Sequence, residues 1–332
     1  MKTAGIDVGH DELEVVLLLD GKRHQARRFG NHATDHQQIV KLLRGKRVGR
    51  VCVEATGTYH IDIAVALSRA EGIEVMVVNP KAVKHYAEAQ LSRQKTDLED
   101  AFLLADYAQR MAFTAWCPPP EAVLQVRAAA RRLHALTRQR TEAKNQHHAY
   151  GVTGTTPAFV LEDIEHTIHQ FDGQIERLKQ QTLALIRDDA DLCMAFDLLC
   201  TTKGVAQTSA IRILGELAVF PMELTDKQWV AMAGLDPRHH ISGASVKRQT
   251  RISKAGNKYL RGALYMPALA ATQHDPYVRA YYRHLIENRG LKKIQALCAV
   301  MRKLLHAFHG MLKNRQPFDN TRFFNAEAAG AT

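Results

Sequence analysis

Three successive prolines, Pro118 to Pro120 in the stretch CPPPEA, divide the chain into two parts with different hydrophobic patterns. Proline fixes φ and lacks a backbone N–H, so a helix or strand cannot continue through this point. Before it, short apolar runs alternate with amphipathic stretches, which is typical of an α/β domain. After it, apolar residues recur every three or four positions, which predicts long helices. We therefore expect an α/β domain over residues 1–115, followed by an all-α part.

The first part predicts the element order βββαβαβα. Three strands are expected in AGIDVG, LEVVLLLD and KRHQARRFG, with Asp20 and Gly21 as a hairpin turn. A helix near 34–44, a strand in RVGRVCVEAT, a helix near 59–71, a strand in IEVMVVNP and helices from about 80 and 97 follow. This order is that of a ribonuclease H-like fold, a mixed sheet with helices on its faces.

The second part predicts a helical pair and then a compact helical domain. Residues of a heptad seam recur at Leu161, Ile164, Ile168, Phe171, Ile175, Leu178, Thr182 and Leu185. Helices at 121–149 and 157–188 should therefore pair antiparallel, giving a coiled-coil region over residues 121–190. The same seam could instead bind a second subunit. Residues 195–320 should form a mostly helical C-terminal domain.

Positive charge is concentrated in one stretch of that domain. The chain carries a formal net charge of +11, which suits a polyanionic partner. No Asp or Glu occurs between Pro237 and His274. The cations in this stretch are Arg238, Lys247, Arg248, Arg251, Lys254, Lys258 and Arg261. A merely solvated basic face would carry interspersed acids, so we expect these residues to bind nucleic acid.

Cysteines and hydropathy indicate the compartment. The five cysteines form no C-x-x-C pair, which favours reduced thiols in a cytosolic protein. No apolar run approaches the roughly 18–20 residues that a membrane span needs, and acids interrupt the N-terminus before the apolar core of a signal peptide could develop. We expect a cytoplasmic protein without a membrane partner.

The stretch RQKTDLEDAFLLADYAQR begins a helix with three acids. Capping by Thr96 or Asp97 and attraction to the helix dipole would explain acids in general. Residues three apart share a helix face, however, so Asp97 and Asp100 lie together while Glu99 points elsewhere. Two carboxylates on one face repel unless a cation lies between them.

Two further acids stand at strands of the same domain. Asp7 lies inside GIDVG and Glu54 closes RVCVEATG, and in the expected fold these two strands are neighbours. A structural role is open for either acid, but both could converge with the Asp97 and Asp100 helix. Four carboxylates in one place need divalent cations. Mg²⁺, as two ions and with Mn²⁺ as the alternative, would suit phosphodiester cleavage or transfer.

Six blocks of the sequence, in order, resemble those of one family. The blocks are GIDVG, VEATGTY, NPKAVKHYAEAQ, KTDLEDA, AGLDPRHHISGAS and RISKAGNKYLRGALYMPALAA. They are similar to the DEDD-type insertion-sequence transposases of the family numbered one hundred and ten and to the related site-specific DNA invertases. The resemblance implies a RuvC-like catalytic domain in which Asp7, Glu54, Asp97 and Asp100 form the DEDD tetrad. It also implies a C-terminal transposase domain.

The same resemblance implies a serine nucleophile and nucleic-acid partners. Ser242 in ISGAS matches the expected nucleophile, with Ser245 as the reserve candidate, in a loop between PRHH and a basic helix. The implied partners are donor and target DNA, a structured noncoding guide (bridge) RNA, and further copies of the chain as a dimer that assembles to a tetramer. The sequence leaves invertase and transposase open. Two rivals are an ATP-using sugar kinase or actin-like ATPase, which also begins with a GIDVG-like strand, and a non-catalytic nucleic-acid-binding protein.

Overall fold

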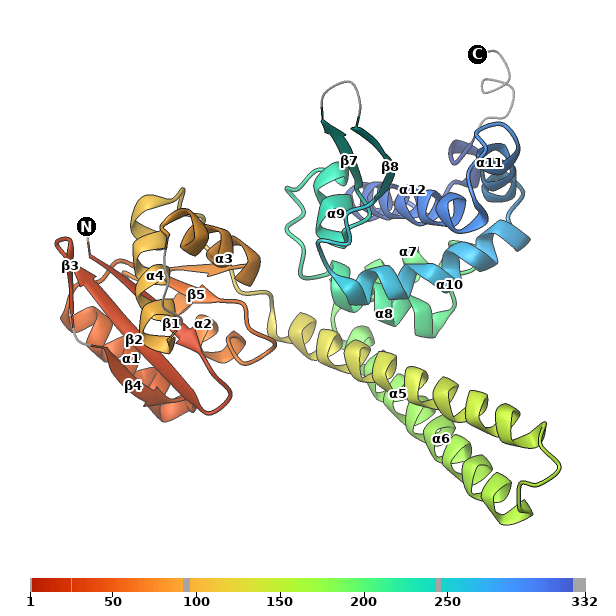
Figure 1. Cartoon of the computed structure of the whole chain (residues 1–332), viewed down its shortest axis with the longest axis horizontal. Helices are drawn as coiled ribbons and strands as arrows, with labels where there is room; N and C mark the ends of the chain where they lie inside the picture. Colours follow the sequence, from red (N-terminus) through yellow and green to blue (C-terminus); the bar gives the residue numbers. More distant parts are fainter. Residues whose placement is uncertain (1, 25, 92–95, 243–245, 325–332) are drawn as a thin grey trace. The chain divides into compact units, whose positions relative to one another are not determined.

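The computed structural model describes residues 2–24, 26–91, 96–242 and 246–324, with only the backbone described in 239–242 and 246–249. The chain forms two compact units, Met1–Pro118 and Pro119–Thr332. The boundary falls among the three prolines, which end the regular structure on either side of it. Figure 1 labels the helices and strands of both units.

The first unit is built on a mixed six-stranded sheet. Its strands are β1 (Thr3–Val8), β2 (Glu12–Leu19), β3 (Lys22–Arg23), β4 (Arg27–Gly30), β5 (Arg50–Glu54) and β6 (Glu74–Val78). They lie in the order β3-β2-β1-β5-β6, with β4 also paired to β2. β1 is antiparallel to β2 and parallel to β5. The predicted ribonuclease H-like fold is thus confirmed.

One expected strand of this sheet is divided in two. We expected KRHQARRFG to form a single third strand, whereas β3 pairs with the end of β2 and β4 with its beginning. β2 is eight residues long, so both short strands find backbone partners on the same neighbour. The hairpin signal at Asp20 and Gly21 predicted that this segment is extended, but not where its pairing is interrupted.

Helices cover both faces of the sheet. α1 (Ala33–Gly45) and α2 (Ile61–Ser68) bury one face, whereas α3 (Pro80–Ala89) and α4 (Asp97–Arg110) pack on the other. β1 shows why both faces need cover. Ala4, Ile6 and Val8 belong to the core under α1 and α2, and the alternate residues Thr3 and Gly5 contact α4.

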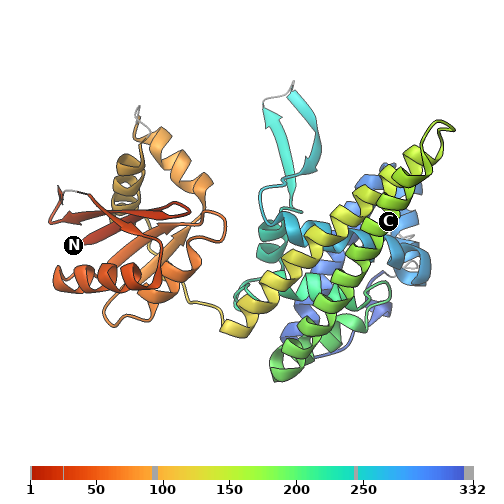
Figure 2. The ribbon, with the colours of Figure 1, turned by 90° about the horizontal axis from the view of Figure 1, so that it is seen from below.

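The second unit begins with two long helices. α5 (Glu121–Gly151) and α6 (Ala158–Asp188) lie side by side as an antiparallel pair (Figures 1 and 2). Their bounds lie within two residues of those that the sequence predicted. Along the predicted seam, Ile164, Ile175 and Thr182 are buried, and Phe171 and Leu178 are half-buried against the core of this unit. The seam therefore packs within the chain along part of its length.

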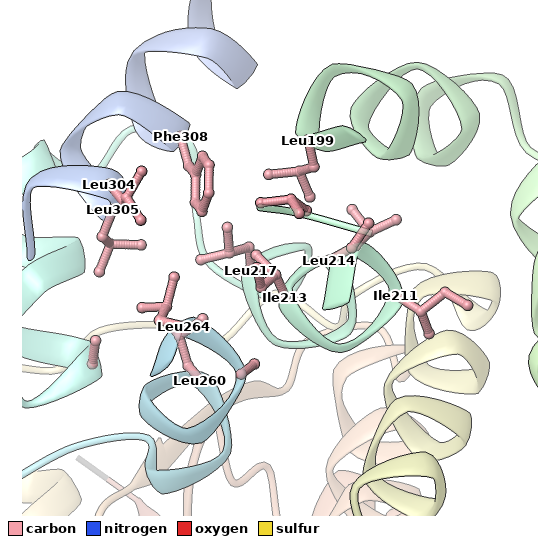
Figure 3. Packing of buried hydrophobic residues seen from close by; sticks show 14 of the residues in the cluster. Leu199, Ile211, Ile213, Leu214, Leu217, Leu260, Leu264, Leu304, Leu305 and Phe308 are labelled. Atoms are coloured by element: carbon pink, nitrogen blue, oxygen red, sulfur yellow. The ribbon is translucent and has the colours of Figure 1, made fainter. Parts of the chain in front are cut away.

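The rest of the second unit is a helical domain around one core. Its helices are α7 (Ala190–Cys200), α8 (Gln207–Leu217), α9 (Asp226–Ala233), α10 (Lys258–His274), α11 (Pro276–Glu287), α12 (Lys293–Asn314) and the short 3-10 helix η1 (Asn320–Arg322). Figure 3 shows Leu217 of α8, Leu264 of α10 and Phe308 of α12 pointing toward one another. In the part of the chain that the structure describes, no helix is long and apolar enough to cross a membrane.

A β-hairpin interrupts these helices. β7 (Pro237–Ser242) and β8 (Val246–Ile252) pair antiparallel, in the region where we expected a loop and the start of a basic helix. The expected loop was wrong, because these residues form two strands, whereas a helix that carries Lys258 and Arg261 does follow as α10, behind its N-cap Asn257. β-Branched residues in VKRQTRI favour an extended chain. The high charge of the segment hid this preference, because it leaves no apolar alternation to read.

Candidate active site

Gly5 allows α4 to lie directly on β1. A Cβ atom at this position would come within 2.0 Å of the carbonyl oxygen of Ala101 and 2.4 Å of the amide nitrogen of Ala105. The hydroxyl of Thr3 also donates a hydrogen bond to the carbonyl oxygen of Ala105 at 2.9 Å. The small residues at both surfaces therefore fix how α4 sits on the strand.

This seat brings the first turn of α4 to Asp7. From Thr3 to Asp7 the strand rises by about 13 Å, at about 3.3 Å per residue. From Ala105 back to Asp97 the helix rises by about 12 Å, at about 1.5 Å per residue. Because Thr3, Gly5 and Asp7 share one face of β1, the two matched rises place Asp7 beneath the acidic start of the helix.

Glu54 lies at the same edge of the sheet as Asp7, because its strand β5 pairs with β1. β1 and β5 are parallel, with Gly5 paired to Cys52 and Ile6 to Val53, so the register continues from Asp7 to Glu54. Cys52, two residues before Glu54, belongs to the core beneath α4. Glu54 therefore lies on the α4 face of the sheet, where its Oε1 accepts a hydrogen bond from the Thr56 hydroxyl at 3.2 Å.

The pKa of Asp7 is raised by its burial and by the other three acids, which lie near it. Burial is the largest cause that raises its pKa to about 6. The charges of Asp100, Asp97 and Glu54 raise it further, in that order. The amide of Val8 donates to Asp7 Oδ1 at 3.0 Å and opposes the shift. The structure thus brings the four predicted carboxylates into one electrostatic cluster.

Glu99 points away from this cluster, as the helix periodicity predicts. Its carboxylate accepts a hydrogen bond from Arg23 Nη1 at 2.9 Å, and the Arg23 guanidinium also lies over the ring of Phe102. Thr96, not Asp97, caps the helix by accepting from the amide of Glu99 at 3.2 Å. Capping therefore accounts for Thr96 and pairing for Glu99. Neither explains Asp97 and Asp100.

The donors of the cluster fit a hard divalent cation. Carboxylate oxygens are the ligands that Mg²⁺ prefers, and one or two of them leave room for phosphate oxygens. Among the residues that the structure describes, no three acidic, His or Cys side chains are close enough together to hold a metal ion. The cluster is therefore an open arrangement with suitable donors, not a closed coordination shell.

Sequence reasoning missed further acids beside the tetrad. One cavity is lined by Asp7 and Asp97 together with Gly9, His10, Asp11, Glu12 and Glu14. Glu14 lies directly opposite Asp7 in the antiparallel β1–β2 pair. The signal was available in the hairpin: once the turn length is known, it fixes which residue of DELEVV faces Asp7.

The cationic stretch lies on the β7–β8 hairpin and the start of α10. In the hairpin Arg238 pairs with Arg251, and His240 with Arg248. Arg238 and Arg251, directly opposite each other, repel. Lys247 also lies on β8, and Lys254 and Lys258 are exposed. Arg261 instead donates to the carbonyl oxygens of Ala233 and Gly256, at 2.8 and 3.2 Å, so part of its donor capacity is used within the fold.

Ser242 ends β7 and its Cα partner is Val246. It belongs to the second unit and the four carboxylates to the first. Ser245, the reserve candidate, lies outside the described residues.

Comparisons with known proteins agree with these observations. A DEDD transposase model of IS110 elements matches residues 4–150, and a model described as "Transposase IS116/IS110/IS902 family" matches residues 196–283. The chain is 30% identical over 269 residues to a "Pilin gene-inverting protein" of Moraxella bovis, covering 80% of this chain and 81% of the relative. The same-named protein of Moraxella lacunata is 29% identical over the same shares.

Among solved structures, "T. thermophilus RuvC in complex with Holliday junction substrate" is 18% identical, with a TM-score of 0.29, over 35% of this chain and 99% of that one. The sequence relationship is the stronger finding, because the matched ranges lie in both units. The chain therefore belongs to the IS116/IS110/IS902 family of transposases, DNA recombinases that include DNA-inverting proteins.

Proposed function

We propose that this recombinase cuts and rejoins DNA strands with the carboxylates Asp7, Glu54, Asp97 and Asp100 and with Ser242 as nucleophile. The observation that carries the proposal is the seating of α4 on β1 at Gly5 and Thr3, with β5 parallel to β1, which gathers Asp7, Glu54, Asp97 and Asp100 at one edge of the sheet. The raised pKa of Asp7, to which burial contributes most and the other three acids add, agrees with this placement. Like charges gathered at a strand end cost stability, so a role in chemistry explains them better than a role in folding.

The four carboxylates would hold two Mg²⁺ ions, or Mn²⁺ in their place. Bound metal supplies a Lewis acid that stabilises charge on the attacking and leaving oxygens of a phosphoryl transfer. In this proposal β1 and β5 fix Asp7 and Glu54 from below, and the first turn of α4 supplies Asp97 and Asp100 from above. The close packing of α4 on β1 at Gly5 would set the distance between the two pairs.

Ser242 would form a transient link to DNA. Its Oγ attacks phosphorus, so that an O–P bond forms while the bond from phosphorus to the leaving strand breaks. The serine proton passes to a base or to water, and the leaving strand takes up a proton as its terminal hydroxyl. Attack by the hydroxyl of another strand reverses these changes and reseals the backbone without ATP.

The cations of the β7–β8 hairpin and the start of α10 would hold nucleic acid. Arg238, Lys247, Arg248, Arg251, Lys254 and Lys258 would neutralise backbone phosphates, with Arg261 bracing the segment behind them. The family resemblance supports donor and target DNA, a structured noncoding guide RNA, and a dimer that assembles to a tetramer. The kinase or ATPase alternative loses support, because both matching family models are transposases.

The role of the four carboxylates is tested by replacing each of them with Asn and measuring strand exchange. The full chain would be given a plasmid that carries the DNA flanking its gene, together with RNA transcribed from that DNA. We expect Asn at Asp7, Glu54, Asp97 or Asp100 to abolish exchange and to leave nucleic-acid binding unchanged, since binding depends on Lys and Arg. Exchange at the wild-type rate by any of these variants would remove that acid from the site.

Ser242→Ala tests the nucleophile. We expect it to bind DNA and RNA but to form no covalent protein–DNA adduct after denaturation with detergent. An adduct formed by Ser242→Ala and lost in Ser245→Ala would transfer the role to Ser245. Hydrolysed ends without adduct or resealed product would identify water as the nucleophile. Scoring inversion and excision on the same plasmid would separate an invertase from a transposase.

A further inference from the structure

A row of charged residues crosses the sheet beside the tetrad. The register pairs Asp7 of β1 with Glu14 of β2, and Glu14 with Arg28 of β4. Their strand neighbours Leu13 and Phe29 pack in the core under α1 and α2. Because successive side chains alternate between faces, Glu14 and Arg28 lie on the α4 face together with Asp7.

The ion pair in this row has one fixed member and one exposed member. Arg28 Nε donates to Glu14 Oε2 at 3.0 Å, and Arg28 Nη1 lies 3.6 Å from Glu12 Oε2. The side chain of Glu14 is only 12% exposed, whereas that of Arg28 is 63% exposed. Glu14 is therefore held by the sheet, and it orients a guanidinium that remains open to solvent.

The guanidinium of Arg28 lies beside the acidic cavity that Asp7 lines. Glu14 lines the same cavity as Asp7 and Asp97, and the charge of Asp97 is among those that raise the pKa of Arg28. A DNA backbone that approaches so many carboxylates is repelled. A cation at the rim of the cavity reduces that repulsion, and a guanidinium does so with directed hydrogen bonds to phosphate oxygens.

We propose that Arg28, oriented by Glu14, binds a backbone phosphate of the DNA strand that the four carboxylates cut. The proposal rests on the proposed function, because it takes the cavity at Asp7 as the place where DNA is cut. Arg28 touches the substrate, and Glu14 is a positioning residue that acts through Arg28.

The first test removes the charge of Arg28 in the full chain. Strand cutting would be measured over a range of concentrations of the plasmid that carries the DNA flanking the gene. We expect Arg28→Gln to raise the KM about tenfold, as for loss of one charge-assisted hydrogen bond, and Arg28→Lys to recover part of the loss. The slope of log affinity against log salt should fall by roughly one.

The matched control is Arg44→Gln. Arg44 lies on α1, which covers the other face of the sheet, and its Nη2 is 3.9 Å from Glu71 Oε2. Arg44→Gln removes the same charge from an arginine of comparable exposure, 55% against 63% for Arg28, so its KM should equal that of the wild type. A KM for Arg28→Gln equal to that for Arg44→Gln would overturn the proposal.

A double variant separates phosphate binding from simple neutralisation. If Arg28 served only to neutralise Glu14 opposite Asp7, removing both charges in Glu14→Gln/Arg28→Gln would restore cutting, and that result would also overturn the proposal. If Arg28 binds phosphate, the double variant stays as impaired as Arg28→Gln. Melting temperatures of all variants would be compared, so that a loss caused by unfolding is recognised and corrected for the folded fraction.

Asp7→Asn in the same assay distinguishes a failure of the proposed function from a failure of the role of Arg28. If Asp7→Asn still cuts DNA, the proposed function has failed and the role of Arg28 fails with it. If Asp7→Asn is inactive while Arg28→Gln behaves as Arg44→Gln does, only the role of Arg28 is wrong.

Discussion

Asp7 is half-buried and Glu216 is buried, and the charges that surround the two acids are opposite in sign. Asp7 of β1 is surrounded by carboxylates, which raise its pKa beyond the effect of burial. The side chain of Glu216 in α8 is only 2% exposed, and cations surround it. Arg131 donates to it twice, at 2.7 and 3.2 Å, and Arg127 Nε lies 3.4 Å from its Oε2.

Glu216 also ties three helices together. Asn257 Nδ2 donates to its Oε2 at 2.6 Å, and the same Asn257 caps α10 by accepting from the amides of Tyr259 and Leu260. α5, α8 and α10 thus meet at one carboxylate. The comparison teaches that the acid paired with its own cations, Glu216, serves the fold, whereas the mutual repulsion of the carboxylates around Asp7 favours the binding of a cationic ligand.

The largest effect is expected from Glu216→Gln. The amide leaves the cations of Arg127 and Arg131 without a counter-charge, and it presents a donor to their donors. We expect the second unit to lose about 3–5 kcal/mol of unfolding free energy, as when one partner of a buried pair is removed. Urea unfolding would be followed by the fluorescence of Trp229, which is fully buried in this unit, in a Trp116→Phe background.

The control for this prediction is Glu142→Gln. Glu142 lies on α5 with its side chain 60% exposed and 3.4 Å from Arg138. Its removal should change the unfolding free energy by less than about 1 kcal/mol. Equal unfolding midpoints for Glu216→Gln and Glu142→Gln would show that burial and pairing do not distinguish the two sites.

Gly5→Ala should have the next largest effect. The added methyl group would overlap the backbone of α4 at Ala101 and Ala105, which cannot move without lifting the helix from β1. We expect a loss of about 3 kcal/mol in the first unit, at the upper end of the usual range for overpacking. The transition would be followed by Trp116 in a Trp229→Phe background. Gly49→Ala, where a Cβ meets nothing within 4 Å, is the control.

Asp7→Asn should stabilise the first unit in the presence of EDTA, opposite in sign to Glu216→Gln. The folded pKa of Asp7, about 6, lies above its ordinary value of 3.8. The ionised form therefore opposes folding: this cost is absent below pH 3.8 and complete above pH 6. After allowance for partial solvent exposure, Asn should add about 1–2 kcal/mol at pH 8 and nothing at pH 3.5. A gain that does not change with pH would contradict the electrostatic explanation.

Mg²⁺ should offset the stability advantage that Asp7→Asn has over the wild type in EDTA. If the carboxylates bind the ion, adding Mg²⁺ at pH 8 raises the melting temperature of the wild type more than that of Asp7→Asn. Matched ionic strength with NaCl is the control, because general screening would shift both proteins equally. Equal shifts would count against a metal site at Asp7.

Local patterns predicted much of the first unit, and contacts distant in sequence set the rest. Short apolar runs predicted β1 and β5, and Asp7 and Glu54 were found because acids are unusual at such strands. Glu14 was missed because its place opposite Asp7 depends on the length of a turn. Glu216 was missed because its cations lie on α5, about 85 residues away in sequence, and one acid on an amphipathic helix carries no sign of burial.

Glu99→Gln should have the smallest effect and separates pairing from burial. Glu99 stands in the first turn of α4 between Asp97 and Asp100, yet like Glu216 it has its own cation, Arg23, at 2.9 Å. Its side chain is 24% exposed, so water already screens the pair. We expect a loss below about 1 kcal/mol at pH 7, with the Mg²⁺ response of the wild type retained. A variant that loses the Mg²⁺ response would place Glu99 with the tetrad, and the rule that a carboxylate with its own cation serves the fold would then fail inside the site itself.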